Sequence, residues 1–216
     1  FNLMQNELSN LNRVGQSLPN FLVARDAYNG LRLWRRAWKG PEIAGTSSVS
    51  IIADGDRVFG LDGNRLVILN AATGELLKNL PTPDLPNKIL FSDGLLVTAG
   101  RIGISAIDVN TGKERWHFPA KAPYGTVVDG GRVFCLVGTR QKSGRWLHEV
   151  LGIDLQSGKE QWRKPVQSVH AVRKSSALRI HFAANGILCL VDRQIVRILS
   201  AKNGREKWSK TSRAEG

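Results

Sequence analysis

The chain has 216 residues, of which 31 are Lys or Arg and 18 are Asp or Glu, so its formal net charge is +13. A chain of this length can bury a substantial core in one large domain or in two small ones. Two cysteines and four scattered histidines show no metal-binding spacing, and no run of about 18 apolar residues is present, so the sequence favours neither a metal site nor a transmembrane helix.

The first part of the chain, residues 1–20, shows no clear strand or turn pattern and no basic, apolar signal peptide. Phe1 is not an initiator methionine, so we expect a fragment of a longer protein. We divide the chain into an irregular N-terminal segment, 1–20, a patterned region, 21–210, and a short tail, 211–216.

An eleven-residue pattern first appears at residues 24–34 and returns at 68–78, 106–116, 152–162 and 198–208. Each copy has Asp, Asn or Ser at its third position and Gly at its seventh, and four copies end in Trp. The short polar side chain can bond back to turn amides and Gly accepts a positive φ, so each copy predicts a tight hairpin. The Trp is expected to pack between neighbouring units, where its N–H finds a partner. The repeat positions are Asp26, Gly30, Trp34, Gly74, Asp108, Gly112, Trp116, Asp154, Gly158, Trp162, Gly204 and Trp208.

A second turn signal lies between the copies of the first. Asp54-Gly55, Asp93-Gly94, Asp129-Gly130 and Asn185-Gly186 each join two apolar runs, which is a strong hairpin signal. One unit is therefore four antiparallel strands. Successive repeat glycines are 44, 38, 46 and 46 residues apart, the length of a propeller blade. The sequence predicts an all-β fold, a β-propeller of four complete blades preceded by a hairpin over residues 21–36.

The motif Ala-x-Asp-x-x-Thr-Gly-x-x-x-Trp, carried in full by residues 106–116, resembles the repeat of the PQQ-type (quinoprotein-dehydrogenase-like) β-propellers, including their tryptophan-docking motif. The resemblance covers about residues 22 to 210. Asn70 and Lys78 depart from it in the second copy and Ser200 in the last. We therefore expect weak docking and an exposed side chain at Lys78, but buried side chains at the last three tryptophans of the repeat. The family's rings typically have six to eight blades, so the resemblance implies that this chain is an incomplete, open arc of a larger ring.

The family's functions differ widely. Its rings serve quinoprotein dehydrogenases, an outer-membrane assembly lipoprotein that only scaffolds, and sensor domains, mostly in bacterial proteins. The dehydrogenases hold PQQ with Ca²⁺ through axial carboxylates and amides, and many have adjacent cysteines, which this chain lacks. Four aspartates near turns have capping as their ordinary use: Asp56, Asp62, Asp93 and Asp192.

We therefore expect a non-catalytic binding or scaffold segment that needs no cofactor on its own. The alternative is part of a PQQ-dependent dehydrogenase whose PQQ and calcium site is completed by blades outside this sequence. The resemblance also implies an extracytoplasmic location, in the periplasm or cell envelope.

One insertion interrupts the regular spacing, at residues 139–148. It combines basic and aromatic groups, which could grip an acidic partner or stack on a sugar or base. The alternative is a longer hairpin with Trp146 folded onto its own strand. The remaining positive charge is dispersed and no nucleic-acid motif accompanies it, so we expect the partner to be the rest of the propeller or another protein, and not nucleic acid. The candidate partner-binding residues are Arg140, Lys142, Arg145, Trp146 and His148.

The two cysteines, Cys135 and Cys189, lie in apolar runs on the same strand of consecutive units. Equivalent strands of neighbouring blades are usually too far apart for the roughly 7 Å limit between disulfide-bonded Cα atoms. We expect both to be buried, reduced thiols.

Overall fold

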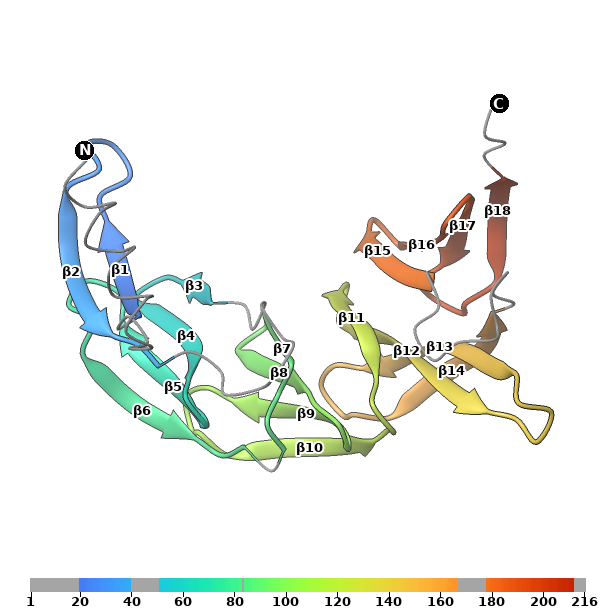
Figure 1. Cartoon of the computed structure of the whole chain (residues 1–216), viewed down its shortest axis with the longest axis horizontal. Helices are drawn as coiled ribbons and strands as arrows, with labels where there is room; N and C mark the ends of the chain where they lie inside the picture. Colours follow the sequence, from blue (N-terminus) through green and yellow to red (C-terminus); the bar gives the residue numbers. More distant parts are fainter. Residues whose placement is uncertain (1–19, 40–50, 83, 167–177, 212–216) are drawn as a thin grey trace, which may run out of the picture.

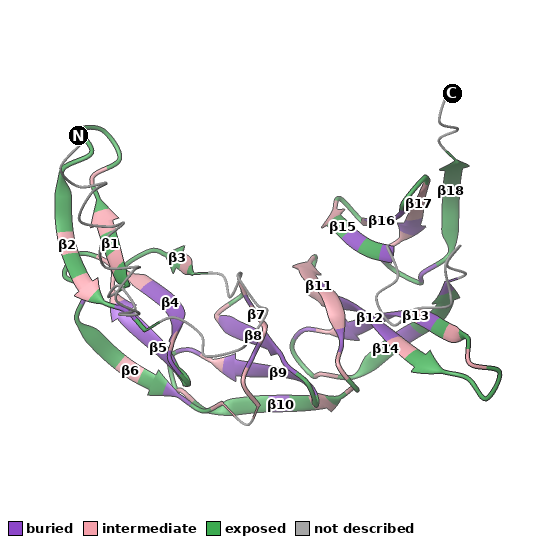
Figure 2. Ribbon diagram, in the orientation of Figure 1, coloured by how far each residue is buried: buried purple, intermediate pink, exposed green. Residues whose placement is uncertain are grey.

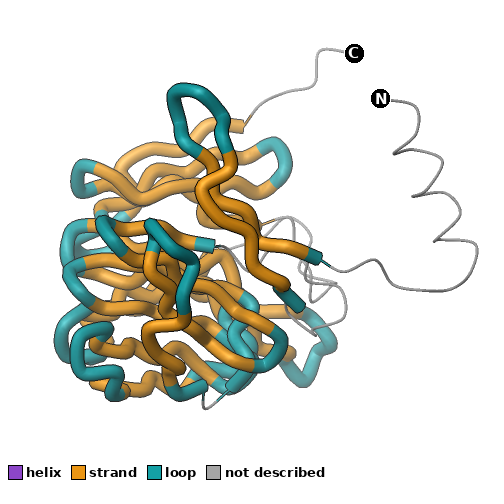
Figure 3. Tube along the Cα trace, turned by 90° about the vertical axis from the view of Figure 1, so that its left-hand side faces the viewer, coloured by secondary structure: helices purple, strands orange, loops and turns teal. Residues whose placement is uncertain are grey.

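The computed structural model describes residues 20–39, 51–82, 84–166 and 178–211, and these residues form strands and turns without a helix (Figure 3). Strands β1 (Phe21–Arg25) and β2 (Arg32–Ala37) form a two-stranded antiparallel sheet. The strands begin at Phe21 and end at Thr211; of the expected N-terminal segment only Asn20, and of the expected tail only Thr211, lie within the described residues.

The other strands form four sheets of four, each made of consecutive antiparallel strands. Blade 1 contains β3 (Ile52–Asp54), β4 (Arg57–Asp62), β5 (Arg65–Asn70) and β6 (Leu76–Leu80). Blade 2 contains β7 (Lys88–Ser92), β8 (Leu95–Ala99), β9 (Gly103–Asp108) and β10 (Glu114–Pro119). Blade 3 contains β11 (Tyr124–Asp129), β12 (Arg132–Arg140), β13 (Trp146–Asp154) and β14 (Glu160–Val166). Blade 4 contains β15 (Leu178–Ala184), β16 (Ile187–Asp192), β17 (Ile195–Ser200) and β18 (Glu206–Thr211).

The blades follow one another along an arc, with the β1–β2 hairpin at one end and blade 4 at the other (Figure 1). The first strands of neighbouring blades touch along the inside of the arc, β3 with β7, β7 with β11 and β11 with β15. In the described part of the chain, the two ends do not pair with each other. The prediction of an unclosed propeller with four blades and an N-terminal hairpin is confirmed.

The core lies between the units, in four clusters that each join two consecutive units. Trp38 packs with blade 1, Phe59 lies between blades 1 and 2, Leu151 between blades 2 and 3, and Phe134 between blades 3 and 4. Buried residues concentrate in the middle strands, and the outer strands are largely exposed (Figure 2). Burying a Leu or Phe side chain stabilises a fold by about 1.5–3 kcal/mol, so the blades depend on being stacked.

The repeat turns have the predicted chemistry. All five repeat glycines have positive φ, from 67° at Gly204 to 74° at Gly74 and Gly112. The carboxylate of Asp108 accepts the backbone N–H groups of Asn110 and Thr111. The bond from the Thr111 amide is the largest cause that lowers the pKa of the Asp108 carboxyl.

At three junctions a tryptophan connects one unit to the next, as the repeat predicts. Trp34 donates its indole N–H to the carbonyl oxygen of Ala71, at 2.7 Å, and Trp162 donates to Ala201, at 3.1 Å. Trp116 makes the same bond and, like Trp162, is 9% exposed. The prediction that Trp116 and Trp162 are buried is confirmed.

The expected exposure of Lys78 and the expected burial of Trp208 are wrong. Lys78 is half-buried, because its alkyl stem lies on Gly112 and its ammonium donates to the carbonyl oxygen of Asn110, at 2.8 Å. Like the tryptophans, Lys78 contacts the repeat turn of the following unit, but through its ammonium group and alkyl stem and not through an indole ring. Trp208 is 49% exposed, because no following repeat packs on it in the described part of the chain.

Both cysteines are free and buried, as predicted. Cys135 belongs to the cluster between blades 2 and 3. Cys189 lies between Leu188 and Leu190, which face blade 3, so alternation along the strand turns its side chain to the opposite face of blade 4. The thiols therefore occupy the same strand in two blades but face in opposite directions along the arc.

Candidate functional site

A groove of about 1550 Å³ lies at one end of blades 2, 3 and 4. Because the strands of each blade alternate in direction, the β8–β9 turn, the β12–β13 hairpin and the crossovers between blades all fall at this end, opposite the repeat turns. The lining comes from three units: Asp84, Arg101, Ile102, Pro119, Ala120, Lys121, Ala122, Tyr124, Gly138, Thr139, Arg140, Trp146, Leu178 and Arg179.

One wall is the β8–β9 turn with the chain that crosses from blade 2 to blade 3. The carboxylate of Asp84 accepts the N–H of Ile102, at 2.8 Å. The crossover is tied to the same turn, because Ala120 and Ala122 donate their N–H groups to the carbonyl oxygens of Ile102 and Arg101, at 3.0 and 2.7 Å. These bonds hold the turn and the crossover together as one wall.

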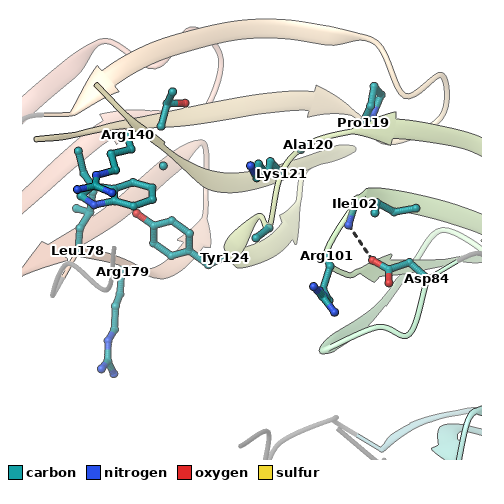
Figure 4. Close-up of a pocket in the computed structure, with 14 residues that line it drawn as sticks. Asp84, Arg101, Ile102, Pro119, Ala120, Lys121, Tyr124, Arg140, Leu178 and Arg179 are labelled. Atoms are coloured by element: carbon teal, nitrogen blue, oxygen red, sulfur yellow. Dashed lines mark hydrogen bonds between the residues drawn. The ribbon is translucent and has the colours of Figure 1, made fainter. Parts of the chain in front are cut away.

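The other wall belongs to blades 3 and 4. Tyr124 begins β11, and Arg140 and Trp146 face each other across the far end of the β12–β13 hairpin. In Figure 4, Tyr124, Arg140 and Arg179 lie together, across the groove from Arg101. The groove therefore runs between two walls that are far apart in the sequence.

The electrostatic character of the groove is positive. Arg101, Lys121, Arg140 and Arg179 are exposed, and none of them takes part in an ion pair with another described residue. The single lining carboxylate, Asp84, is already engaged by a backbone amide. Four cations around one hollow create a field that attracts anionic groups.

A buried histidine supports this wall from beneath. His148 is 0% exposed, and its Nδ1 lies 2.7 Å from the hydroxyl oxygen of Tyr124. Burial lowers the pKa of His148, and the nearby Asp192 carboxylate opposes that shift. His148 therefore takes up a proton less readily than a solvent-exposed histidine, and its contact with the Tyr124 hydroxyl holds Tyr124 in place from below the groove.

The five residues predicted to form a binding loop lie in three different environments in the structure. Arg140 and Trp146 line the groove, Lys142 and Arg145 are exposed in the turn that joins β12 to β13, and His148 is buried. The inserted segment is a lengthened hairpin whose strands pair as far as Arg140 and Trp146, and Trp146 lies on Gly138 of its own sheet. The extended-hairpin interpretation thus describes the backbone, and the binding role of the loop stays a prediction.

Three of the four lining cations and the lining tyrosine were missed because they lie outside the inserted loop: Arg101, Lys121, Arg179 and Tyr124. The predicted strand order could have indicated that these residues lie close together. Strands alternate in direction, so residues in crossovers and in second-to-third-strand turns meet at one end of every blade.

The groove does not fit a calcium-dependent PQQ centre. Ca²⁺ takes six to eight oxygen ligands, whereas this lining has one carboxylate and four cations. Over the whole described part of the chain, no group of three or more His, Cys, Asp or Glu side chains could hold a metal ion. Likewise, none of the described residues forms a helix long and apolar enough to cross a membrane.

The stacked four-stranded blades, the Asp-to-Gly repeat turns and the docking tryptophans define a PQQ-type β-propeller repeat protein. The model of the family described as outer membrane protein assembly factor BamB matches residues 16–90 and 86–216, and the chain belongs to this family. None of the curated protein sequences matches the chain significantly.

Solved structures share the fold at low identity. BamB from Moraxella catarrhalis is 14% identical with a TM-score of 0.63, over 91% of this chain and 60% of its own. The quinohemoprotein alcohol dehydrogenase ADHIIG from Pseudomonas putida HK5 is 15% identical with a TM-score of 0.56, over 80% of this chain and 34% of its own. Kluyveromyces lactis Hsv2 is 10% identical with a TM-score of 0.59, over 90% of this chain and 59% of its own.

The chain therefore spans less than two thirds of each of these proteins. An assembly factor and an alcohol dehydrogenase share the architecture, so the fold by itself does not choose between binding and catalysis.

Proposed function

We propose that the chain is a non-catalytic binding or scaffold segment of a larger PQQ-like propeller protein, and that it contacts other proteins through the groove. One observation carries this proposal: three different units bring four exposed cations, none in an ion pair with a described residue, to one hollow beside two aromatic rings. Such a lining recognises anionic groups.

The chemistry of the lining supports binding over catalysis. A catalytic site needs a nucleophile beside a base, or an acid and a base with suitably shifted pKa values. The imidazole that contacts the lining residue Tyr124, His148, is buried, and its Nδ1 lies 2.7 Å from the Tyr124 hydroxyl oxygen. The one lining carboxylate, Asp84, holds the β8–β9 turn.

The family match supports the same proposal. The matching family is described as an outer membrane protein assembly factor, which favours a role in contacting other proteins and a location in the periplasm or cell envelope. The second candidate, part of a PQQ-dependent dehydrogenase, is favoured by the structural likeness to a quinohemoprotein alcohol dehydrogenase. Its PQQ and calcium site would need residues beyond those described.

The ends of the arc favour the rest of a propeller as one partner. All six residues of β18 are exposed, and the β1–β2 sheet has no further strand among the described residues. Unpaired strand edges recruit other strands, so natural proteins cover them. Two further strands would extend the β1–β2 sheet to a four-stranded blade, and a further blade would pack on the face of blade 4 that carries Trp208.

The test is a titration of the protein at its natural full length with PQQ, with and without Ca²⁺, followed by calorimetry and by reduction of an electron-accepting dye with a primary alcohol. We expect no saturable PQQ binding and no alcohol-dependent dye reduction. Stoichiometric PQQ binding together with dye reduction would overturn the non-catalytic role. A purified quinoprotein dehydrogenase is the positive control.

A further inference from the structure

We infer that the groove binds an extended acidic peptide segment of a partner protein, with carboxylates against the groove's cations and an apolar side chain against Tyr124 and Trp146. This inference rests on the proposed binding function and adds the chemistry of the partner and the place where it lies. The groove is defined by the lining residues named above.

The size of the groove favours a peptide over a small molecule. Small-molecule pockets usually measure about 300–1,000 Å³, whereas this hollow measures about 1550 Å³. It runs between the β8–β9 turn and the end of the β12–β13 hairpin, and Lys121, on the crossover from blade 2 to blade 3, lies between that turn and that hairpin (Figure 4). An extended chain matches such a hollow.

The charges favour carboxylates. Three of the four cations are arginines, whose planar guanidinium binds a carboxylate through two parallel hydrogen bonds. Arg101 lies on one wall, and Arg140 and Arg179 lie on the other (Figure 4). A segment lying between the walls can therefore meet cations on both sides.

The apolar part of the lining separates a peptide from a nucleic acid. Ile102 is 54% exposed although its backbone is fixed by hydrogen bonds, and Pro119 is exposed in the same hollow. A nucleic acid would need cations spaced along a continuous phosphate backbone. An acidic peptide carries both carboxylates and apolar side chains, so it uses the whole lining.

The wall is shaped before any partner arrives. Ala122 has φ of 48°, a left-handed conformation that is costly for a residue with a Cβ, and its N–H is bonded to Arg101. Strained residues of this kind persist where the surrounding structure holds them, and they concentrate at binding sites. The bend separates Lys121 from Tyr124, which are both groove residues.

The experiment measures fluorescence anisotropy of a labelled peptide that alternates Glu with Leu. The comparison probes are the same peptide with Lys in place of Glu, polyglutamate of equal length and single-stranded oligothymidine. We expect the Glu–Leu peptide to bind most tightly and the Lys–Leu peptide not to bind. Oligothymidine binding as tightly as the Glu–Leu peptide would overturn the inference in favour of non-specific charge or a nucleic acid.

Matched variants locate the site. Arg101→Glu with Arg140→Glu should raise the Kd of the Glu–Leu peptide at least about tenfold. Lys113→Glu with Lys202→Glu changes the net charge equally at the opposite end of the blades, and should leave the Kd within about twofold. Equal weakening by both pairs would overturn the inference.

Two further variants keep the test decisive. Trp146→Ala should weaken the Glu–Leu peptide but not polyglutamate, because only the former presents an apolar side chain. If the double variant at Arg101 and Arg140 has an altered circular dichroism spectrum, the single variant Arg179→Glu, at an exposed position, replaces it. This variant should raise the Kd of the Glu–Leu peptide about threefold. Failure of the Glu–Leu peptide to bind refutes this inference alone, whereas the PQQ titration decides the proposed function.

Discussion

The indole N–H of Trp116 donates a hydrogen bond of 2.8 Å to the backbone carbonyl oxygen of Leu155, a residue 39 positions later in the next unit. The indole also covers Gly158, so that a Cβ added there would lie 2.6 Å from the ring. Trp34 and Trp162 repeat this arrangement at their own junctions. A single side chain therefore connects the edge of each of these units to the turn of the following one.

Trp162→Ala should lower the free energy of unfolding by about 3–5 kcal/mol, because the ring is buried, packs against Phe134 and loses its bond to Ala201. Trp208→Ala should cost no more than about 1 kcal/mol, since that ring is half-exposed. Urea unfolding followed by circular dichroism measures both. Equal losses would show that docking does not stabilise the junctions.

Gly30 and Gly158 have the same φ of 70°, so replacing each by Ala separates the cost of backbone strain from the cost of a side-chain clash. Gly30→Ala should cost about 1 kcal/mol, from the left-handed backbone alone, because nothing lies within 4 Å of the new methyl group. Gly158→Ala should cost at least about twice as much, because the methyl group displaces Trp116. Thermal melting separates the two, and identical melting temperatures would contradict the docking geometry.

Lys78 occupies the place of a docking tryptophan, so replacing it should lower the free energy of unfolding more than replacing an ordinary surface lysine does. Lys78→Ala removes the bond to Asn110 and the contact with Gly112, and should cost about 1 kcal/mol. Lys113→Ala, on an exposed turn position, should stay within about 0.5 kcal/mol. Chemical unfolding of both variants measures these changes. An unchanged free energy of unfolding for Lys78→Ala would mean that the contacts of Lys78 with Asn110 and Gly112 do not stabilise the junction.

The thiol of Cys135 should be unreactive in the native protein. Burial raises the pKa of Cys135 to about 12, so almost no thiolate exists at about pH 8. A thiol-reactive dye should label Cys135 only after unfolding, as followed by mass spectrometry. The unfolded thiol ionises earlier than the folded one, so this group makes stability fall as pH rises from about 9 towards 12. Rapid native labelling would contradict the burial.

Cys135→Ser should cost about 1–3 kcal/mol, because the new hydroxyl lies in an apolar cluster. Cys135→Ala, which adds no polar group, is the matched control. A serine variant as stable as the alanine variant would mean that the hydroxyl finds a partner.

Acid should weaken the protein through His148. Burial lowers its pKa below 6.5, so the unfolded state binds the proton first and stability is lost as pH falls below about 6.5. The facing groups are the Tyr124 hydroxyl and the Asp192 carboxylate, which opposes the shift. His148→Gln should show a smaller fall in unfolding free energy between about pH 7.5 and pH 5.5. An unchanged pH dependence would place the titration elsewhere.

Much of the fold could be predicted from the sequence because propeller signals are local. The polar residue and the Gly of each turn lie four residues apart, as in Asp108 and Gly112, and they determine their own backbone. Residues 139–148 could likewise be recognised as an insertion from spacing alone. Among the repeat positions, the tertiary contacts corrected only Lys78 and Trp208, whose exposure depends on the contacts made by the neighbouring unit.

The amino-acid sequence by itself determined the turn chemistry, the blade length and the tryptophan positions, since each depends on residues close together in the chain. Only the tertiary structure decided that Arg101, Lys121, Arg140 and Arg179 meet in one groove, because strand direction and blade stacking bring their separate turns to one end. It also placed His148 beneath Tyr124, where burial lowers the pKa of the imidazole.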